Sequence, residues 1–181
     1  MLKTAENVSF GHPDKVCDQI SDAILDECLR QDLNSRVAVE TVGGHGKLFI
    51  IGELTTTAKI DVAKIARQVY QEIGYSDELD ISVNLVHQSP DIAQGVDIGG
   101  AGDQGIMIGY ATTETKELLP LEHVLAAKLI RRLEKVRADK DNQLSQFLGP
   151  DGKAQVTLEN DKVKTVVLST QHSKNINQDV L

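Results

Sequence analysis

The sequence has few aromatic residues, at 3 % of the chain, and no tryptophan. A hydrophobic core must therefore be mainly aliphatic. Cysteine is rarer still, with only Cys17 and Cys28. On a single helix their Cα atoms would lie roughly 16 Å apart, at about 1.5 Å per residue, whereas a disulfide requires Cα atoms within about 7 Å. We therefore expect two small core residues and no disulfide.

Long apolar runs and a surplus of positive charge are also missing. No stretch approaches the roughly 20 apolar residues of a membrane-spanning helix, and the N-terminus lacks the apolar segment of a secretory signal. A cytoplasmic protein without a membrane partner is therefore expected. With 19 Lys and Arg against 27 Asp and Glu, the net charge is −8, which argues against a nucleic-acid partner. A nucleotide ligand remains open, because local charge decides its binding.

The composition is typical of a globular protein, with 40 % hydrophobic and 25 % charged residues. The length of 181 residues is enough for one large domain or two small ones. Apolar periodicity predicts strands and helices in the order β-α-β-β-α-β. Their expected ranges are residues 2–5 (strand), 13–31 (helix), 35–42 and 47–55 (a hairpin), 62–73 (helix) and 80–86 (strand).

A loop over residues 87–103 follows, and then the order begins again. It predicts a strand over residues 106–112, a helix after Pro120, strands over 154–159 and 163–169, and a helix starting near Asn175. The fold class is therefore α+β with repeated β-α-β-β-α-β units, of which the second is incomplete. We predict an N-terminal domain over residues 1–95 and a partial central domain over residues 96–181.

The segment Gly11-His12-Pro13-Asp14-Lys15 combines groups that suit a polyphosphate. Pro13 fits the first position of a helix, whose N-terminus attracts anions. His12 and Lys15 add donors, and Asp14 can hold a metal ion. A plain helix cap with surface charges explains the same residues. A J-domain, which shares His-Pro-Asp, is disfavoured because too little chain precedes His12 for its upstream helix.

In the hairpin, a four-residue turn at Gly43-Gly44-His45-Gly46 would place Glu40 opposite Phe49 and Arg36 opposite Glu53. Because side chains alternate, Glu40 and Glu53 then share a face with apolar neighbours, while Val37, Val39, Leu48 and Ile50 form the core face. The mixed face suggests an interface or a ligand site. A solvated outer face with an Arg36–Glu53 pair is the alternative.

Two further motifs are weaker. Gly100-Ala101-Gly102-Asp103-Gln104-Gly105 matches the dinucleotide-binding pattern G-x-G-x-x-G, but a loop precedes it and a β-like run follows it, the wrong context for that fold. The stretch from Gln88-Ser89-Pro90-Asp91-Ile92 into the glycine-rich run suits a mobile loop that closes an active site, or an ordinary linker.

Together these motifs resemble one family, the S-adenosylmethionine synthetases, over nearly the whole chain. The matching segments are Val8-Ser9-Phe10-Gly11-His12-Pro13-Asp14-Lys15, Asp18-Gln19-Ile20-Ser21-Asp22-Ala23, Val39-Glu40-Thr41, Gly52-Glu53-Leu54-Thr55-Thr56, Gln88-Ser89-Pro90-Asp91-Ile92, Gly100-Ala101-Gly102-Asp103-Gln104-Gly105, Pro150-Asp151-Gly152-Lys153-Ala154-Gln155-Val156-Thr157 and Ser169-Thr170-Gln171-His172-Ser173.

The resemblance implies three similar β-α-β-β-α-β domains and active sites between two subunits. It also implies a reaction in which the methionine sulfur attacks C5′ of ATP and expels triphosphate, which is then cleaved to pyrophosphate and phosphate, with Mg²⁺ and K⁺. The implied roles are: catalysis by His12 and Lys153; ATP binding by His12, Lys15, Asp151 and Lys153; methionine binding by Glu53, Gln88 and Asp103; Mg²⁺ binding by Asp14 and Glu6; K⁺ binding by Glu40.

The chain departs from the family pattern in three ways. Phe10 stands where the family usually has an acid, and the stretch over residues 97–100 is shorter than the usual gating loop. The motifs of the family's second half, an Arg-Lys pair, further lysines and an aspartate that cradle the triphosphate, do not occur here. We therefore expect a subunit of a split synthetase, active with a complementary C-terminal-half chain in a hetero-oligomer. A non-catalytic regulatory or scaffold subunit, and a plain fragment, are the alternatives.

Overall fold

The computed structural model describes residues 1–174 and 176 and has the α+β class expected from the sequence. It contains two three-stranded sheets, β1-β5-β6 and β2-β3-β4. The chain forms two compact units. The terminal unit comprises Met1–Lys15, Ile73–Tyr75 and Tyr110–Leu181, and the inner unit comprises Val16–Glu72 and Ser76–Gly109. The domain boundary expected near residue 95 stays a prediction. Within the described part of the chain, no helix has the length and apolarity to cross a membrane.

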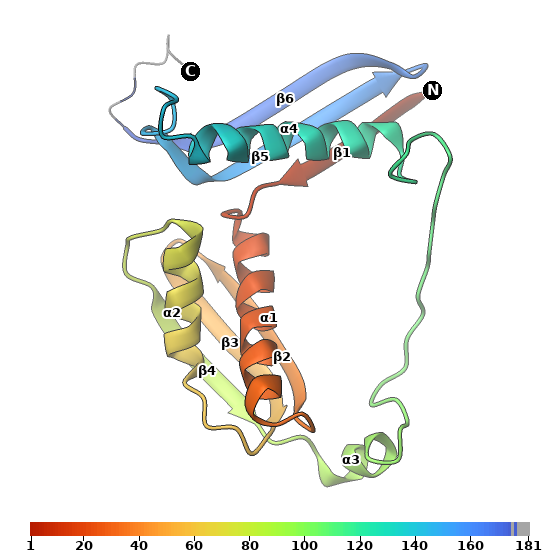
Figure 1. Ribbon diagram of the computed structural model, residues 1–181. Coiled ribbons are helices and arrows are strands. Elements are labelled where there is room, and N and C mark those ends of the chain that lie inside the picture. The colour runs from red at the N-terminus through yellow and green to blue at the C-terminus, as the bar shows by residue number, and fades with distance from the viewer. Residues whose placement is uncertain (175, 177–181) are drawn as a thin grey trace. The chain divides into compact units, whose positions relative to one another are not determined.

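The inner unit places helices on one face of its sheet, as Figure 1 shows. The helices are α1 (Pro13–Gln31) and α2 (Val62–Ile73), and the strands are β2 (Arg36–Gly44), β3 (Lys47–Thr55) and β4 (Asp80–Val86). Val39, Leu48 and Ile50 are buried under the helices, and Thr41 Oγ1 donates a 2.6 Å hydrogen bond to the Cys17 carbonyl of α1. The predicted core face is therefore confirmed.

Cys17 and Cys28 form no disulfide, and both are buried on α1, as the helical spacing predicted. Burial is the main cause that raises the pKa of the Cys28 thiol. A protonated, buried thiol packs as a small apolar side chain and is chemically inert. Cys17 and Cys28 are therefore core residues of α1.

The hairpin turn differs from the expectation. It contains two residues, His45 and Gly46, whose φ angles are 52° and 77°. A two-residue turn with positive φ at both positions matches the twist of the strands, which favours it over the expected four-residue turn. Arg36 consequently lies opposite Thr55 instead of Glu53, and Glu40 lies opposite Ile51 instead of Phe49. The register moves by an even number of residues, so every side chain keeps its predicted face.

The terminal unit corrects one expectation. The strand β1 (Leu2–Val8) does not join the sheet of β2, β3 and β4 to make four strands, but pairs antiparallel with β5 (Leu148–Glu159). One face of β1 carries Lys3, Ala5 and Asn7, which lie opposite the buried residues Leu158, Val156 and Ala154 of β5. This face of β1 therefore packs on the core of the terminal unit. The strand β6 (Lys162–His172) and the helix α4 (Leu121–Ala138) complete this unit. Ala126 of α4 packs with Val156 and Leu158.

Residues 106–112 form no strand, contrary to the sequence pattern. Ile106, Met107 and Ile108 are each more than nine-tenths exposed. Their apolar side chains have the β propensity that suggested a strand, but no described strand pairs with them, and pairing is what stabilises an extended segment. The short helix α3 (Pro90–Val96) lies within the predicted loop. A helix expected near Asn175 lies outside the described residues.

Gly52 occupies a position in β3 that only glycine fits. Its φ is +125°, and a Cβ there would lie 2.1 Å from the Ala38 carbonyl oxygen of the neighbouring strand. Gly52→Ala should therefore destabilise the protein by about 3 kcal/mol or more, measured by urea unfolding. Gly44→Ala is the matched control in the same hairpin, because a Cβ at Gly44 meets nothing within 4 Å. Equal stability of the two variants would contradict this packing.

Candidate functional site

The turn that carries His12 is clamped by the strand β5. Ser9 N donates to the Gly152 carbonyl at 2.9 Å, and Gly11 N donates to the Pro150 carbonyl at 3.2 Å. The buried Ser9 hydroxyl donates to the same Pro150 oxygen at 2.7 Å. A Cβ on Gly11 would lie 2.4 Å from the Pro150 carbonyl carbon. Glycine at this position thus permits the close approach that fixes the start of α1.

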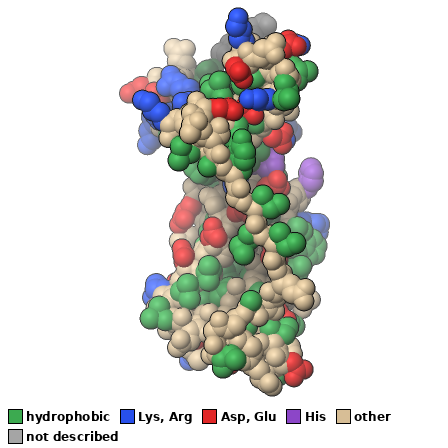
Figure 2. All heavy atoms as spheres, turned by 90° about the vertical axis from the view of Figure 1, so that its right-hand side faces the viewer, with side chains coloured by type: hydrophobic (Ala, Val, Ile, Leu, Met, Phe, Trp, Pro, Cys, Tyr) green, Lys and Arg blue, Asp and Glu red, His purple; other side chains and the backbone are tan. Residues whose placement is uncertain are grey.

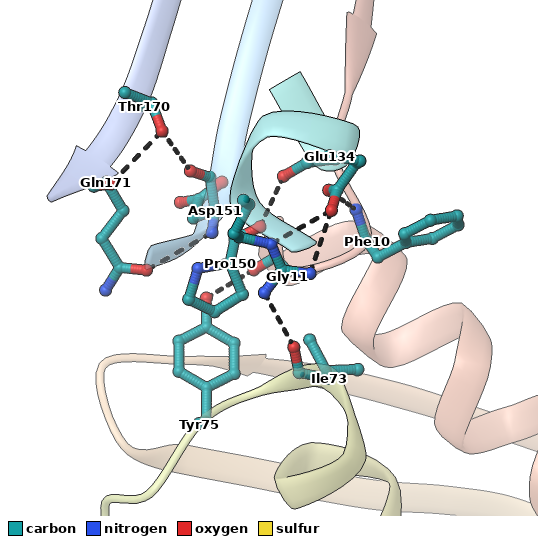
Figure 3. A network of polar contacts seen from close by, with 11 residues as sticks. Phe10, Gly11, Ile73, Tyr75, Glu134, Pro150, Asp151, Thr170 and Gln171 are labelled. Atoms are coloured by element: carbon teal, nitrogen blue, oxygen red, sulfur yellow. Dashed lines mark hydrogen bonds and ion pairs between the residues drawn. The ribbon is translucent and has the colours of Figure 1, made fainter. Parts of the chain in front are cut away.

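Side chains from distant parts of the terminal unit hold the same turn (Figure 3). Tyr75 Oη donates to the Gly11 carbonyl at 2.6 Å. Glu134 Oε1 accepts from the Phe10 amide at 3.4 Å, and its other oxygen accepts from Arg137. The ring of Phe10 points away from this network in Figure 3. A carboxylate of α4 thus meets the backbone at Phe10.

The His12 ring has a defined tautomer. Its Nδ1 accepts a hydrogen bond from Asp14 N at 3.3 Å, so in the neutral ring the proton resides on Nε2. The His12 side chain is about one-quarter exposed, at 23 %, and the Asp14 side chain is largely exposed, at 86 %. Lys15 is likewise exposed in the first turn of α1. His12 can therefore donate from Nε2 to a ligand.

Glu6 and Lys153 meet on the outer face of the terminal sheet. Lys153 lies opposite Val8, beside the Glu6–Gln155 pair, and Lys153 Nζ is 2.8 Å from Glu6 Oε1. Asp151 lies two residues before Lys153, in the stretch of β5 where the register with β6 is irregular; its amide donates to Gln171 Oε1 at 3.3 Å. The structure thus brings together a predicted ATP-binding lysine and a predicted metal-binding carboxylate.

Glu40 and Glu53 share the outer face of the inner sheet, as predicted. Glu40 lies opposite Ile51, and Glu53 lies opposite Ala38 in the next pair of that face. Phe49 and Ile51, at 46 % exposure each, surround the acids with apolar surface. The outer face of the inner sheet therefore mixes carboxylates with apolar groups. Figure 2 shows hydrophobic side chains, in green, next to acidic ones, in red, on the side of the molecule that it draws.

Gln88 follows β4 and is fixed from the opposite edge strand, β2. Arg36 Nε donates to Gln88 Oε1 at 2.9 Å, and the Gln88 amide donates to Thr55 Oγ1 at 3.2 Å. Asp103 lies in the exposed glycine-rich segment, where its Oδ1 accepts from Gln104 N at 2.7 Å. The strand pattern suggested Glu53 as the partner of Arg36 and gave no sign of the contact with Gln88, because Gln88 lies 52 residues away.

The predicted site residues fall into two sets. Glu6, His12, Asp14, Lys15, Asp151 and Lys153 belong to the terminal unit, and Glu40, Glu53, Gln88 and Asp103 belong to the inner unit. Among the described residues, no three His, Cys, Asp or Glu side chains lie together as a metal-binding group. The assignments of Glu6, Asp14 and Glu40 to metal ions stay predictions.

Sequence models of two domains from one family match nearly the whole chain. The N-terminal domain of S-adenosylmethionine synthetase matches residues 1–94, and its central domain matches residues 98–181. These enzymes are methionine adenosyltransferases, transferases of S-adenosylmethionine biosynthesis that bind ATP and methionine and generally depend on Mg²⁺ and K⁺. The two matches follow one another in the order of the family, and the observed α+β fold agrees with them. The chain therefore belongs to the S-adenosylmethionine synthetase family.

Proposed function

We propose that the chain is a catalytic subunit of a split, cytoplasmic S-adenosylmethionine synthetase, which makes S-adenosylmethionine, pyrophosphate and phosphate from ATP and methionine. A complementary C-terminal-half chain completes the hetero-oligomer. The observation that carries the proposal is the held His12 turn: four backbone and side-chain hydrogen bonds from Ser9, Gly11 and Tyr75 fix it. A scaffold has no need of a donor fixed in this way.

The reaction explains the residue types. The methionine sulfur needs no base to activate it, because a thioether carries no proton to remove. The main barrier therefore lies in expelling triphosphate from C5′. Donors preorganised toward the departing oxygens lower such a barrier. The Nε2–H of His12 would donate to the leaving oxygen, while Lys153, with Lys15 and Asp151, would hold ATP. Glu53, Gln88 and Asp103 would orient the amino acid end of methionine.

The carboxylates of the terminal unit offer the oxygen ligands that Mg²⁺ prefers. Mg²⁺ is usually held by one or two carboxylates together with substrate phosphates, so it needs no complete protein cage. The exposed Asp14 meets this requirement, and Glu6 would contribute after releasing Lys153. Glu40 would serve K⁺. The metal ions would neutralise phosphate charge, and the residues named here would position them.

Lys153 gives the test that separates a catalytic subunit from a scaffold. Lys153→Met in the assembled enzyme should reduce synthesis about a hundredfold or more, because it removes a cation from the leaving group, and should leave association unchanged. Lys47→Met is the matched control, since Lys47 forms an ion pair of the same kind with Asp80 at 2.9 Å in the inner sheet. Steady-state assays with pull-down of the partner measure both properties. Unchanged synthesis with Lys153→Met would favour the regulatory subunit.

A further inference from the structure

Arg36 links the inner sheet to the segment that carries the predicted methionine-binding residues. Its Nε donates to Gln88 Oε1 at 2.9 Å, and its Nη1 donates to Asp97 Oδ1 at 2.7 Å. Gln88 stands just before α3, and Asp97 is the C-cap residue of that helix. The Arg36 side chain is 27 % exposed, so much of the fork is shielded from water. One guanidinium therefore ties both ends of the α3 segment to β2.

The chemistry of this contact determines how the Gln88 amide is oriented. A guanidinium has only donors, so the amide group must turn its oxygen toward Arg36. Its nitrogen, Nε2, then faces away from Arg36 and keeps two donors. A Cβ placed on Gly102 would lie 4.0 Å from this Nε2, and 3.3 Å and 3.8 Å from methyl groups of Val96 and Ile92. The oriented donor thus faces the glycine-rich segment that continues into Asp103, beside the apolar side of α3.

We propose that Arg36 is a positioning residue for methionine: it holds the Gln88 amide with Nε2 as a donor to the substrate carboxylate. This inference rests on the proposed function. The charges are complementary, because Glu53 and Asp103 offer acceptors to the α-ammonium group, whereas a carboxylate requires a donor. Without Arg36 the amide would rotate freely, and the ordering cost would fall on substrate binding.

The decisive experiment compares methionine affinity with ATP affinity in the assembly with the complementary chain. Arg36→Gln should raise the KM for methionine about tenfold or more, while the KM for ATP stays within about twofold. Arg30→Gln is the matched control, because Arg30 forms a comparable fork with Glu27 on the surface of α1. A parallel rise in both KM values, or no rise for methionine, would overturn the proposal.

A double-mutant cycle tests whether Arg36 acts through Gln88. In a Gln88→Ala background, Arg36→Gln should add no further loss of methionine affinity, since the amide it orients is gone. Additive losses would mean that Arg36 contacts methionine directly, which would overturn the positioning role. Arg36→Lys keeps the charge but lacks the planar fork of donors, so it should also weaken methionine binding. It is the second variant to measure if Arg36→Gln fails to fold.

Two readouts do not depend on turnover. Calorimetric binding of methionine to the assembly should weaken with Arg36→Gln, and hydrogen exchange of residues 88–102 should accelerate, whereas Arg30→Gln leaves both unchanged. An assembly that binds methionine in this Arg36-dependent way but makes no product would refute the proposed function and keep the inference. Normal binding and exchange in Arg36→Gln would refute the inference while an active assembly keeps the function.

Discussion

His12→Ala is expected to lower S-adenosylmethionine synthesis about 10²–10³-fold in the assembled enzyme, the usual loss for one preorganised donor to a developing charge. The structure supplies the physical reason. Asp14 N occupies Nδ1, the proton resides on Nε2, and β5 holds the turn through Pro150 and Gly152. The donor is thus in place before the charge develops, and little reorganisation remains for the reaction.

The same substitution should leave stability almost unchanged. The hydrogen bonds that join the turn to β5 and to Tyr75 come from Ser9, Gly11 and Tyr75. The His12 side chain adds only the long, exposed bond from Asp14 N at 3.3 Å, whose donor water can satisfy in the variant. Kinetics and a thermal melting curve of the variant, next to His123→Ala on α4 as a control, separate the two effects. His12→Gln should recover part of the rate, because its amide can still donate. An unchanged rate for His12→Ala would contradict the catalytic role of His12. A large fall in melting temperature would show instead that His12 stabilises the fold.

Face parity was the most predictable part of the fold. The alternation of Val37 and Val39 with Ala38 and Glu40 specifies which side of β2 is buried, whatever the turn. The turn itself was predicted two residues too long, yet Glu40 and Glu53 still share the outer face, because an even shift preserves parity. Such local patterns are enough to predict the inner unit, because its consecutive strands β2, β3 and β4 form one sheet.

Long-range pairing was not predictable in the same way. The alternation in β1 identifies a strand but not its partner, and its partner β5 lies about 150 residues away in the chain, as Thr4 opposite Thr157 shows. Glu134 and Tyr75 meet the His12 turn from 124 and 64 residues away in the chain, and no periodicity of a glutamate or tyrosine signals such a contact. Arg36 is the same kind of case, since its charge predicts an acidic partner and the structure adds a glutamine.

The last expected result is that this chain alone makes no S-adenosylmethionine, and that a complementary C-terminal-half chain restores synthesis. Electrostatics gives the first reason. A departing triphosphate needs several cations, whereas the described site residues offer Lys15 and Lys153, and Glu6 already binds Lys153 at 2.8 Å. Unneutralised phosphate charge would oppose the reaction.

Packing gives the second reason, since the described residues cover the terminal sheet incompletely. Its edge strand β6 exposes Val163, Val166 and Leu168 to between 49 % and 55 %. Between β6 and α4 lies a groove of about 230 Å³, and its lining is almost wholly apolar: Leu125, Lys128, Leu129, Val156, Val163 and Val166. An uncovered edge with apolar side chains favours association, so a partner that covers it would bury apolar surface and bring its cations to the site.

The test is to purify this chain alone and together with the complementary chain, and to assay product from ATP, methionine, Mg²⁺ and K⁺. The complex should be stable, with an interface above about 2,000 Å² in total, as in obligate assemblies. Val166→Lys places a charge in the groove and should weaken association, whereas Val42→Lys, at a 64 % exposed site of the inner sheet, is the control. Full activity of the chain alone would refute the split enzyme. Neither activity nor association with any second-half chain would favour the fragment, because the groove would then have no such partner.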